Sequence, residues 1–333
     1  MPIGGVLAAD GAVVPNAVGV DIGCGMTAVR TDLEELTSGE LRSVTEAVKR
    51  EIPLGFSHHK KPQSWEGFRK APKVPVVQQE LDSARYQLGT LGGGNHFIEL
   101  QSGDDGYLWI MVHSGSRNFG YTIAREFDRI ARADAKKRGL VLPDSQLSPL
   151  YIGSPEAEAY LSAMEFALRF AAASRDHMAQ RVISIVKRYR PQMRCIDTVS
   201  IHHNYAALET HYGKEVVLHR KGATSARSGE RGIIPGSQGT PSYIVEGLGS
   251  PESFSSCSHG AGRVMGRKEA QRKLNLKYEQ EKLTKAGIVH SLWSVRDLDE
   301  APGAYKDIDR VMAAQRDLVR PLVRLTPLAV VKG

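Results

Sequence analysis

The stretch Tyr107-Leu108-Trp109-Ile110-Met111-Val112 runs without interruption into His113-Ser114-Gly115-Ser116-Arg117. Six consecutive apolar and aromatic residues of this kind are typical of a strand that is buried on both faces. The small residues that follow leave room around the His113 ring for a ligand to approach the backbone. The stretch therefore predicts a buried sheet with a polar site at the end of one strand.

The segments on either side of this strand alternate irregularly between strand and helix patterns. Short strands are predicted at 198–202, 215–218, 243–245 and 328–331, and 13–20 is expected to be extended as well. Helices are predicted at 37–51, 76–88, 123–138 and 154–189. Ser154-Pro155-Glu156 is a strong helix start, because it combines a Ser cap, a first-position proline and an early acidic residue. We therefore predict an α+β fold rather than a regular βαβ repeat.

Length and composition limit the classes of protein to consider. The chain has 333 residues, 41% of them hydrophobic, and no linker-like stretch divides it, so residues 1–333 are expected to form a single domain. No apolar run reaches 18 residues, no signal peptide is recognisable, and the three cysteines lack CxxC spacing. These features favour a cytoplasmic protein without a membrane anchor. The net charge of +7 is moderate evidence for a polyanionic partner.

Five short stretches place a His or Cys directly against Gly, Ser or Asn. They are Asp21-Ile22-Gly23-Cys24-Gly25, Gly92-Gly93-Gly94-Asn95-His96, His113 to Arg117, His202-His203-Asn204 and Ser258-His259-Gly260-Ala261-Gly262-Arg263. Thiolate and imidazole groups bind transition metals well, and a carboxylate can complete the ligand set. The candidate metal ligands are therefore Asp21, Cys24, His96, His113 and His203.

Each of these residues taken alone has a simpler interpretation. A free cysteine is often a small buried hydrophobe, and a lone histidine is often structural. The recurrence of the pattern favours a ligand cluster, although in extended backbone only one of His202 and His203 is expected to bind a given metal. One thiolate and three imidazoles favour zinc, iron or cobalt, whereas phosphate oxygens at open positions could make Mn²⁺ suitable.

His259 differs from the other four because three small residues and then Arg263 follow it. A phosphate ester could lie against that backbone, with the Arg263 guanidinium balancing its charge. His259 could be a further ligand, a general acid or base, or a covalent nucleophile that takes up a phosphoryl group. The sequence has no P-loop, no GxGxxG and no Lys-x-Asp-Gly, so histidine is the available nucleophile for covalent nucleotide activation. The basic stretch His219-Arg220-Lys221-Gly222 could hold backbone phosphates or be a solvated turn.

These blocks, in this order, resemble those of the RtcB family of RNA-splicing ligases. The resemblance extends from residue 2 to the last residue and rests on 18–25, 88–99, 113–117, 203–204, 234–240, 258–263, 304–309 and 331–333. It implies a mixed or antiparallel, sandwich-like sheet core surrounded by helices. It also implies a GTP- and Mn²⁺-dependent ligase that joins an RNA 3′-phosphate or 2′,3′-cyclic phosphate to a 5′-hydroxyl, in tRNA splicing or RNA repair.

The resemblance also assigns roles to residues. His259 would take up GMP, and two Mn²⁺ ions would share Cys24, with Asp21, His96, His113 and His203 as the other ligands. Zinc or cobalt could occupy the sites in the protein as isolated, and archease is a candidate helper protein. Contacts with the nucleotide or its phosphates map onto Asn95, Glu99, Arg117, Asn204, Ser237, Ser242, Gly260, Ala261, Gly262, Arg263, Tyr305 and Lys332.

The sequence departs from the family pattern at its start. Family members carry a Pro-Asp-Val-His segment upstream of the Pro-Ile-Gly-Gly block, whereas this sequence begins at Met1-Pro2-Ile3-Gly4-Gly5. Because that segment serves the family's active site, two alternatives stay open. One is a metal-dependent phosphodiesterase that opens 2′,3′-cyclic phosphates without joining ends, and the other is a non-catalytic protein that binds RNA ends.

Overall fold

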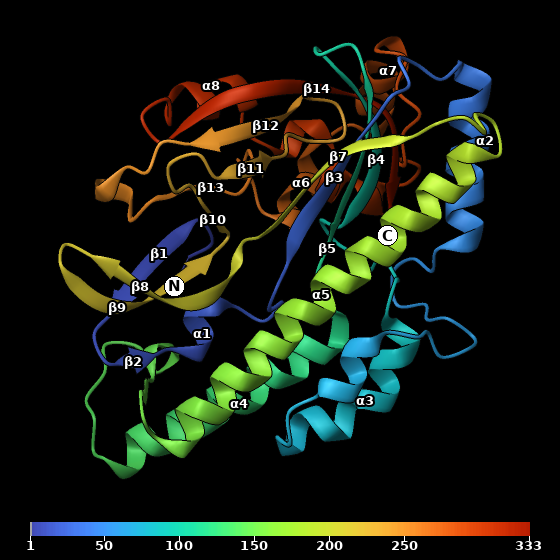
Figure 1. Ribbon diagram of the computed structural model, residues 1–333. Helices are drawn as coiled ribbons and strands as arrows, with labels where there is room; N and C mark the ends of the chain where they lie inside the picture. Colours follow the sequence, from blue (N-terminus) through green and yellow to red (C-terminus); the bar gives the residue numbers. More distant parts are fainter. Residues whose placement is uncertain (1) are drawn as a thin grey trace.

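A seven-stranded antiparallel sheet forms the centre of the computed structural model, which describes residues 2–333 (Figure 1). Each strand pairs antiparallel with its neighbours. Their spatial order is β11 (Arg231–Ile234), β12 (Ser242–Gly247), β14 (Val319–Lys332), β4 (Phe97–Gly103), β5 (Leu108–Ser114), β3 (Gly25–Thr31) and β7 (Cys195–His202). The predicted α+β class is confirmed, and the sheet is antiparallel.

The register of this sheet brings distant parts of the sequence to one edge. All seven residues of β5 are buried, as the apolar run predicts. At the end of β5, His113 lies opposite Phe97 on β4 and opposite Met26 on β3. Gly25 on β3 in turn lies opposite His202 on β7. The ends of four strands therefore deliver residues 24, 96, 113 and 203 to the same place.

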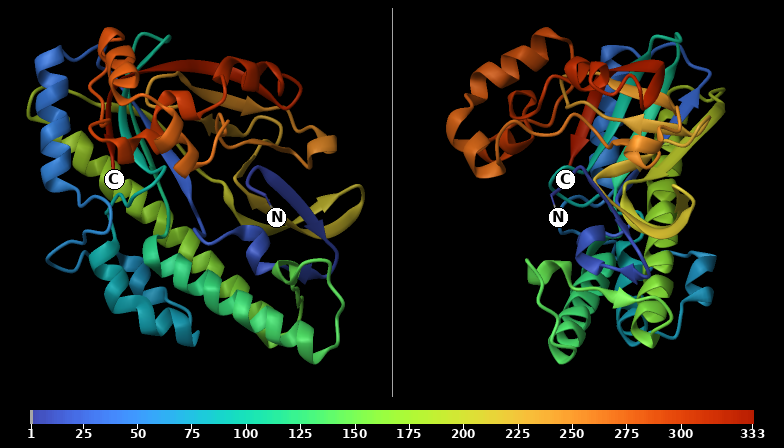
Figure 2. Two further views of the ribbon diagram at one scale, coloured as in Figure 1. Left: turned by 180° about the vertical axis from the view of Figure 1, so that it is seen from behind. Right: turned by 90° about the vertical axis from the view of Figure 1, so that its left-hand side faces the viewer.

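Long helices cover one side of the sheet. The helix α5 (Pro155–Lys187) starts at its Ser154 cap and packs on β3 and β5, on α4 (Arg117–Lys137) and on α2 (Ser38–Glu51). The helix α3 (Pro75–Gln87) packs on α4. Figure 2 shows α6 (Arg267–Lys273) and α7 (Leu276–Lys285) on the opposite side of the sheet from α5.

Smaller sheets and short helices complete the architecture. β1 (Gly5–Ala9), β9 (Lys214–Lys221) and β8 (Asn204–His211) form a three-stranded sheet. Two-stranded pairs join β10 (Ala223–Ser225) to β13 (Ser256–Ser258) and β2 (Ala12–Val13) to β6 (Leu150–Tyr151). The remaining helices are α1 (Pro15–Val18), α8 (Ile308–Ala313) and the 3₁₀ turns η1 (Glu66–Lys70), η2 (Ser145–Leu147), η3 (Pro251–Ser253), η4 (Val295–Glu300) and η5 (Pro302–Ala304).

The prediction of an extended segment at 13–20 is wrong over most of its length. Pro15 occupies the first position of α1, where its fixed φ and missing N–H fit a helix start. The Val14 N–H is bound 2.8 Å from His219 Nε2 on β9, so a long-range contact fixes the chain at this point. By contrast, the helix predicted at 37–51 is confirmed, with Thr37 and Glu40 forming a full capping box.

Candidate active site

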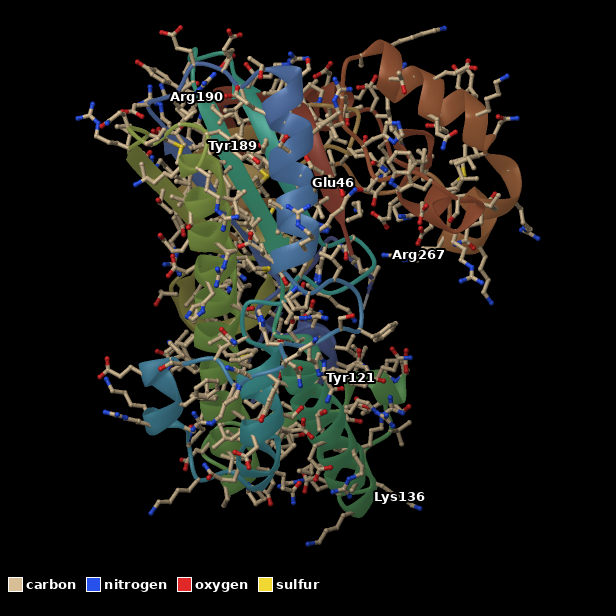
Figure 3. The ribbon with its side chains drawn as sticks, turned by 90° about the vertical axis from the view of Figure 1, so that its right-hand side faces the viewer. Glu46, Tyr121, Lys136, Tyr189, Arg190 and Arg267 are labelled. Atoms are coloured by element: carbon tan, nitrogen blue, oxygen red, sulfur yellow. The ribbon has the colours of Figure 1, made fainter. Side chains whose placement is uncertain are left out.

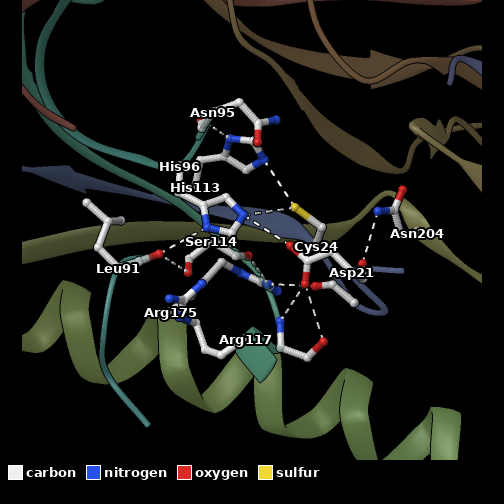
Figure 4. Close-up of polar contacts among 12 residues, drawn as sticks. Asp21, Cys24, Leu91, Asn95, His96, His113, Ser114, Arg117, Arg175 and Asn204 are labelled. Carbon is white, nitrogen blue, oxygen red and sulfur yellow. Dashed lines mark hydrogen bonds and ion pairs between the residues drawn. The ribbon is translucent and has the colours of Figure 1, made fainter. Parts of the chain in front are cut away.

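Four of the predicted metal ligands, Asp21, Cys24, His96 and His113, are shown together at the sheet edge in Figure 4. Cys24 Sγ lies 3.5 Å from His96 Nε2 and 3.4 Å from His113 Nε2. Two groups of three residues each bring their ligand atoms within 4.8 Å of one another: Cys24, His113 and His203 form one group, and Asp21, Cys24 and His96 form the other. Cys24 belongs to both groups, so the five side chains form two candidate metal positions that share one sulfur.

Backbone carbonyls fix the orientation of two of the histidine rings. His96 Nδ1 lies 3.0 Å from the Leu91 carbonyl oxygen, and His113 Nδ1 lies 3.1 Å from the Asn95 carbonyl oxygen. A carbonyl oxygen can only accept, so both Nδ1 atoms carry the proton and donate. In the neutral rings the Nε2 lone pairs then face Cys24, which is the arrangement that holds a metal-binding imidazole in place.

The donor set fits a bound cation on three further observations. His96 Nε2 lies 3.1 Å from a carboxylate oxygen of Asp21, so the two atoms are close enough to bind the same ion. The Nδ1 atom of His203 is buried and has no partner among the described residues. Burial and the neighbouring histidines lower the pKa of His113 and of His203 well below the ordinary value, so both imidazoles are neutral.

The surroundings of Cys24 and Asp21 shift their pKa values in opposite directions. Burial, together with the charge of Asp21, raises the pKa of the Cys24 thiol, so a thiolate there requires a neighbouring cation. Asp21 Oδ1 accepts the Ser116 N–H at 3.0 Å, at the start of α4. Although burial opposes ionisation, His96 and Ser116 hold the pKa of Asp21 below its ordinary value.

Arg175 braces three ligand-bearing segments from the centre of α5, and the sequence analysis did not identify it. Its side chain is fully buried, and its Nη1 donates to the Gly23 carbonyl at 3.0 Å and to the Ser114 carbonyl at 3.1 Å. Its Nη2 lies 3.3 Å from His202 Nδ1. The available signal was a lone arginine in the buried face of an alanine-rich helix, since an arginine is rarely fully buried without a partner.

A cavity of about 620 Å³ opens beside the ligand cluster. Its lining includes eleven of the predicted nucleotide contacts, namely Asn95, Glu99, Ser237, Ser242, His259, Gly260, Ala261, Gly262, Arg263, Tyr305 and Lys332. The His259 ring lies 5.0 Å from the His203 ring, centroid to centroid. Burial lowers the pKa of His259, and a hydrogen bond to the Gly222 backbone opposes this shift. A neutral imidazole therefore lines the cavity next to the candidate metal ligand His203.

Glu300 joins four cavity side chains and was also missed by the sequence analysis. Its carboxylate binds Lys332 Nζ at 2.7 Å, accepts the Tyr305 hydroxyl at 2.6 Å, and pairs with Arg263 at 3.2 Å and Arg267 at 3.0 Å. Burial opposes its ionisation, but Lys332, Tyr305 and Arg267 hold the pKa of Glu300 below its ordinary value. No local motif marks Glu300, because its partners come from other parts of the chain.

Arg267 extends the cationic lining to the cavity mouth. Its guanidinium lies close enough to Gly94 that a Cβ there would meet Nη2 at 3.3 Å. Figure 3 shows Arg267 projecting from the start of α6 toward the rest of the molecule. Arg263, Arg267, Lys306 and Lys332 give the cavity four cations, and its acidic lining residues are Glu99 and Glu300. An anionic ligand therefore fits it.

Two predicted contact residues do not line this cavity. Asn204 donates to the Asp21 carbonyl at 3.0 Å and accepts the Gly222 N–H at 2.8 Å, so it connects the ligand loop to the strand near His259. Arg117 donates to Thr90 and to the Gly55 carbonyl beside the glycine loop, and its φ of 59° is unusual for a non-glycine residue. Their contacts with nucleotide or RNA phosphate stay predictions.

The basic stretch at 219–222 is not a solvated turn, because its first three residues belong to β9. His219 and Arg220 are fully buried in β9. Arg220 forms an ion pair with Glu209 at 2.6 Å, and His219 bridges Val14 to Leu7. Both side chains are therefore occupied within the fold.

An antiparallel α+β fold that gathers this cluster and a cationic cavity at one sheet edge has the features of a metal-dependent enzyme acting on phosphate esters. The family model described as tRNA-splicing ligase RtcB matches residues 1–74 and 63–333. The chain therefore belongs to the RtcB family. No helix among residues 2–333 has the length and apolar character to span a bilayer.

Named relatives agree with this membership. The chain is 39% identical to the RNA-splicing ligase RtcB of Escherichia coli K12, over 99% of this chain and 86% of that protein. It is 32% identical to the tRNA-splicing ligase RtcB of Thermococcus kodakarensis, over 100% of this chain and 85% of that protein. It is 31% identical to the RNA-splicing ligase RtcB of Mycobacterium tuberculosis, over 100% and 94% respectively.

Proposed function

We propose that the protein is a GTP-dependent RNA ligase that joins an RNA 3′-phosphate, or a 2′,3′-cyclic phosphate after hydrolytic opening, to a 5′-hydroxyl. The observation that carries the proposal is the position of His259. Its ring borders both the nucleotide-sized cavity and His203, a member of the Cys24 cluster. A nucleophile, an anion-binding cavity and a two-ion ligand set thus meet at one point.

In the first step, His259 attacks the α-phosphorus of GTP. A phosphorus–nitrogen bond forms, the bond to the β-phosphate oxygen breaks, and pyrophosphate leaves. The attacking nitrogen must carry a lone pair, and the lowered pKa of His259 supplies the neutral ring. Gly260 and Gly262 bear no side chain, so the nucleotide phosphate can approach the backbone beside the nucleophile.

In the later steps GMP is transferred from His259 to the RNA 3′-phosphate. An oxygen of the RNA 3′-phosphate attacks the GMP phosphorus, and the bond to His259 breaks. The 5′-hydroxyl then attacks the RNA phosphorus, the 3′–5′ phosphodiester forms, and GMP leaves. A phosphate monoester is a poor electrophile, and conversion to a GMP-capped end supplies the leaving group it lacks.

The Cys24 cluster would hold the divalent ions, with Mn²⁺ as the proposed metal. Asp21, Cys24 and His96 would hold one ion, and Cys24, His113 and His203 the other. Bound there, the metal would offset the charge of approaching phosphates and activate the attacking hydroxyl.

Glu99 is the residue that we propose selects guanine. It lies in the cavity lining and is 2% exposed. An ionised carboxylate only accepts hydrogen bonds, and guanine presents its N1–H and amino group side by side as donors. Adenine offers an acceptor at N1 instead, so it would place two acceptors face to face.

A two-fragment RNA assay tests the proposal. One fragment carries a 3′-phosphate or, in a parallel reaction, a 2′,3′-cyclic phosphate, and the other carries a 5′-hydroxyl, with GTP and Mn²⁺ present. The wild-type protein should give a joined product, and His259→Ala should give none. His290→Ala, a histidine outside the cavity lining, should ligate like wild type. Failure of the wild-type protein to join these ends would contradict the proposal, and opening of a cyclic end without joining would favour the phosphodiesterase alternative.

A further inference from the structure

Phe56 is an apolar side chain that the fold leaves fully in water. It is 102% exposed, whereas the other phenylalanines of this chain, eight in total with Phe56, are buried or partly buried. It lies in the segment between α2 and α3 (Figure 1). Exposed single hydrophobic residues are common, so exposure alone says little. The residues around Phe56 indicate a functional role for the exposed ring.

A tight turn holds Phe56 in place. The Ser57 N–H donates to the Leu54 carbonyl at 3.0 Å, and Gly55 adopts the φ of 60° that this turn needs. Two backbone hydrogen bonds connect this turn to the glycine loop. The Leu91 N–H donates to the Pro53 carbonyl at 2.9 Å, and the Gly55 N–H donates to the Gly92 carbonyl at 3.0 Å. Phe56 is thus displayed on an anchored turn.

The same turn is connected to the active site. The Gly55 carbonyl accepts a hydrogen bond from Arg117 Nη2 at 3.0 Å. A Cβ at Gly93 would lie 3.8 Å from Gly55 Cα, and Gly93 precedes the cavity residue Asn95 by two positions. The exposed ring therefore stands next to the loop that leads into His96.

Cations without carboxylate partners follow Phe56 along the chain. Lys60 and Lys61 are exposed, and neither forms an ion pair among residues 2–333. The backbone of the segment is nevertheless fixed, because the His59 and Gln63 N–H groups donate to the Tyr86 and Arg85 carbonyls at 3.0 and 2.8 Å. An ordered backbone that presents unpaired cations beside an aromatic ring fits a polyanion with planar bases.

We propose that Phe56 is a stacking platform for a nucleobase of the RNA strand near the reacting end, with Lys60 and Lys61 holding the adjoining phosphates. This inference rests on the proposed function. Every nucleobase offers a face for stacking, so such a contact grips single-stranded RNA without reading its sequence. A protein partner would bury an exposed phenylalanine equally well, but the two neighbouring unpaired lysines favour a phosphate backbone.

RNA binding measured apart from catalysis tests the stacking platform. The probes are two single-stranded RNAs, one ending in a 3′-phosphate and one beginning with a 5′-hydroxyl, each with 2-aminopurine at one terminal nucleotide in turn. Phe56→Ala should weaken binding of one of them roughly 10-fold or more and remove the stacking-induced change in 2-aminopurine fluorescence. Phe56→Trp should restore both, because indole also stacks. Lys60→Ala should weaken binding uniformly and lower its salt dependence.

Val141→Ala is the matched control, because Val141 is 98% exposed and lies in the loop after α4. It should bind both RNAs like wild type, and melting temperatures should show that every variant is folded. Equal affinity of wild type and Phe56→Ala for both RNAs would overturn the stacking inference and leave the proposed ligase intact. A wild-type protein that binds these RNAs through Phe56 but never joins their ends would overturn the proposed function instead.

Discussion

Burial decides the protonation state of the groups around the cavity, and Glu99 gives the clearest consequence. Burial raises the pKa of Glu99 to about 8, against the opposing effects of Lys332 and Gln101. At neutral pH the empty cavity therefore holds mostly the protonated acid, whereas guanine binding requires the carboxylate. Binding should release a proton, so GTP affinity should rise with pH up to about 8 and then level off.

Calorimetry in buffers of different ionisation enthalpy measures this proton release. Between pH 7 and 8 the affinity of the wild-type protein should rise roughly fivefold more than that of Glu99→Gln, because only the ionised fraction binds. The variant also corrects for titration of GTP itself. A pH profile identical in the two proteins would show that Glu99 does not contact the base.

Some site residues carry a local signal in the sequence, whereas Glu99, Tyr305 and Lys332 were assigned only through the family resemblance. The glycine context of Cys24, His96, His113 and His259 is visible within a few positions. The structure brings these side chains together, although their roles in binding metal and GMP stay predictions. Arg175 and Glu300 could not be found in this way, because their partners lie far away along the chain.

At the scale of elements, α5 supports the ligand cluster through Arg175. Arg175→Met should leave the Ser114 carbonyl without its buried donor, at a cost of about 1–3 kcal/mol in the free energy of unfolding. The Gly23 carbonyl also loses Arg175 but keeps the contact with His202 Nδ1 at 3.1 Å. Mn²⁺ affinity should fall as well, since the loop that carries Asp21 and Cys24 loses its brace. Arg175→Lys should recover only part of both losses, because an ammonium cannot reproduce the guanidinium fork.

Thr37→Ala is the matched control for this prediction. It removes the cap of α2, away from the ligands, and should cost about 1 kcal/mol without a change in Mn²⁺ affinity. Denaturant unfolding and metal titration of the three variants give the comparison. Unchanged metal affinity in Arg175→Met would limit Arg175 to a structural role.

Elements with strong terminal signals could be predicted, and elements set by distant contacts could not. Caps at Thr37 and Ser154 identify α2 and α5 from sequence. The extended prediction at 13–20 failed because Pro15 starts α1 and because β9 supplies a partner for Val14. The prediction at 123–138 missed the first six residues of α4, which begins at Arg117, the last residue of the site motif.

At the scale of the whole molecule, metal binding should stabilise the assembled sheet edge. The ligands come from separate strand ends and loops, so ions bound only to the folded protein hold these segments together. At a free Mn²⁺ concentration 100 times the Kd, the gain is about 2.7 kcal/mol per site. Cys24→Ala should lose both ions because the two ligand groups share Cys24, whereas His203→Ala should lose only one.

Elemental analysis and thermal melting with and without chelator check this prediction. Wild type should bind two ions per chain and melt at a lower temperature after chelation. Retention of both ions by Cys24→Ala would contradict a shared sulfur. The strand order behind this arrangement was not predictable from sequence, because antiparallel pairing such as that of β14 with β4 joins segments more than 200 residues apart.

The measurement that tests the central claim most directly is the mass of the protein after incubation with GTP and Mn²⁺ in the absence of RNA. The account predicts a GMP adduct that is acid-labile, is located on His259 by peptide mapping, and disappears when a 3′-phosphorylated RNA is added. His259→Ala should form no adduct. An adduct on another residue, or one that persists in His259→Ala, would contradict the account.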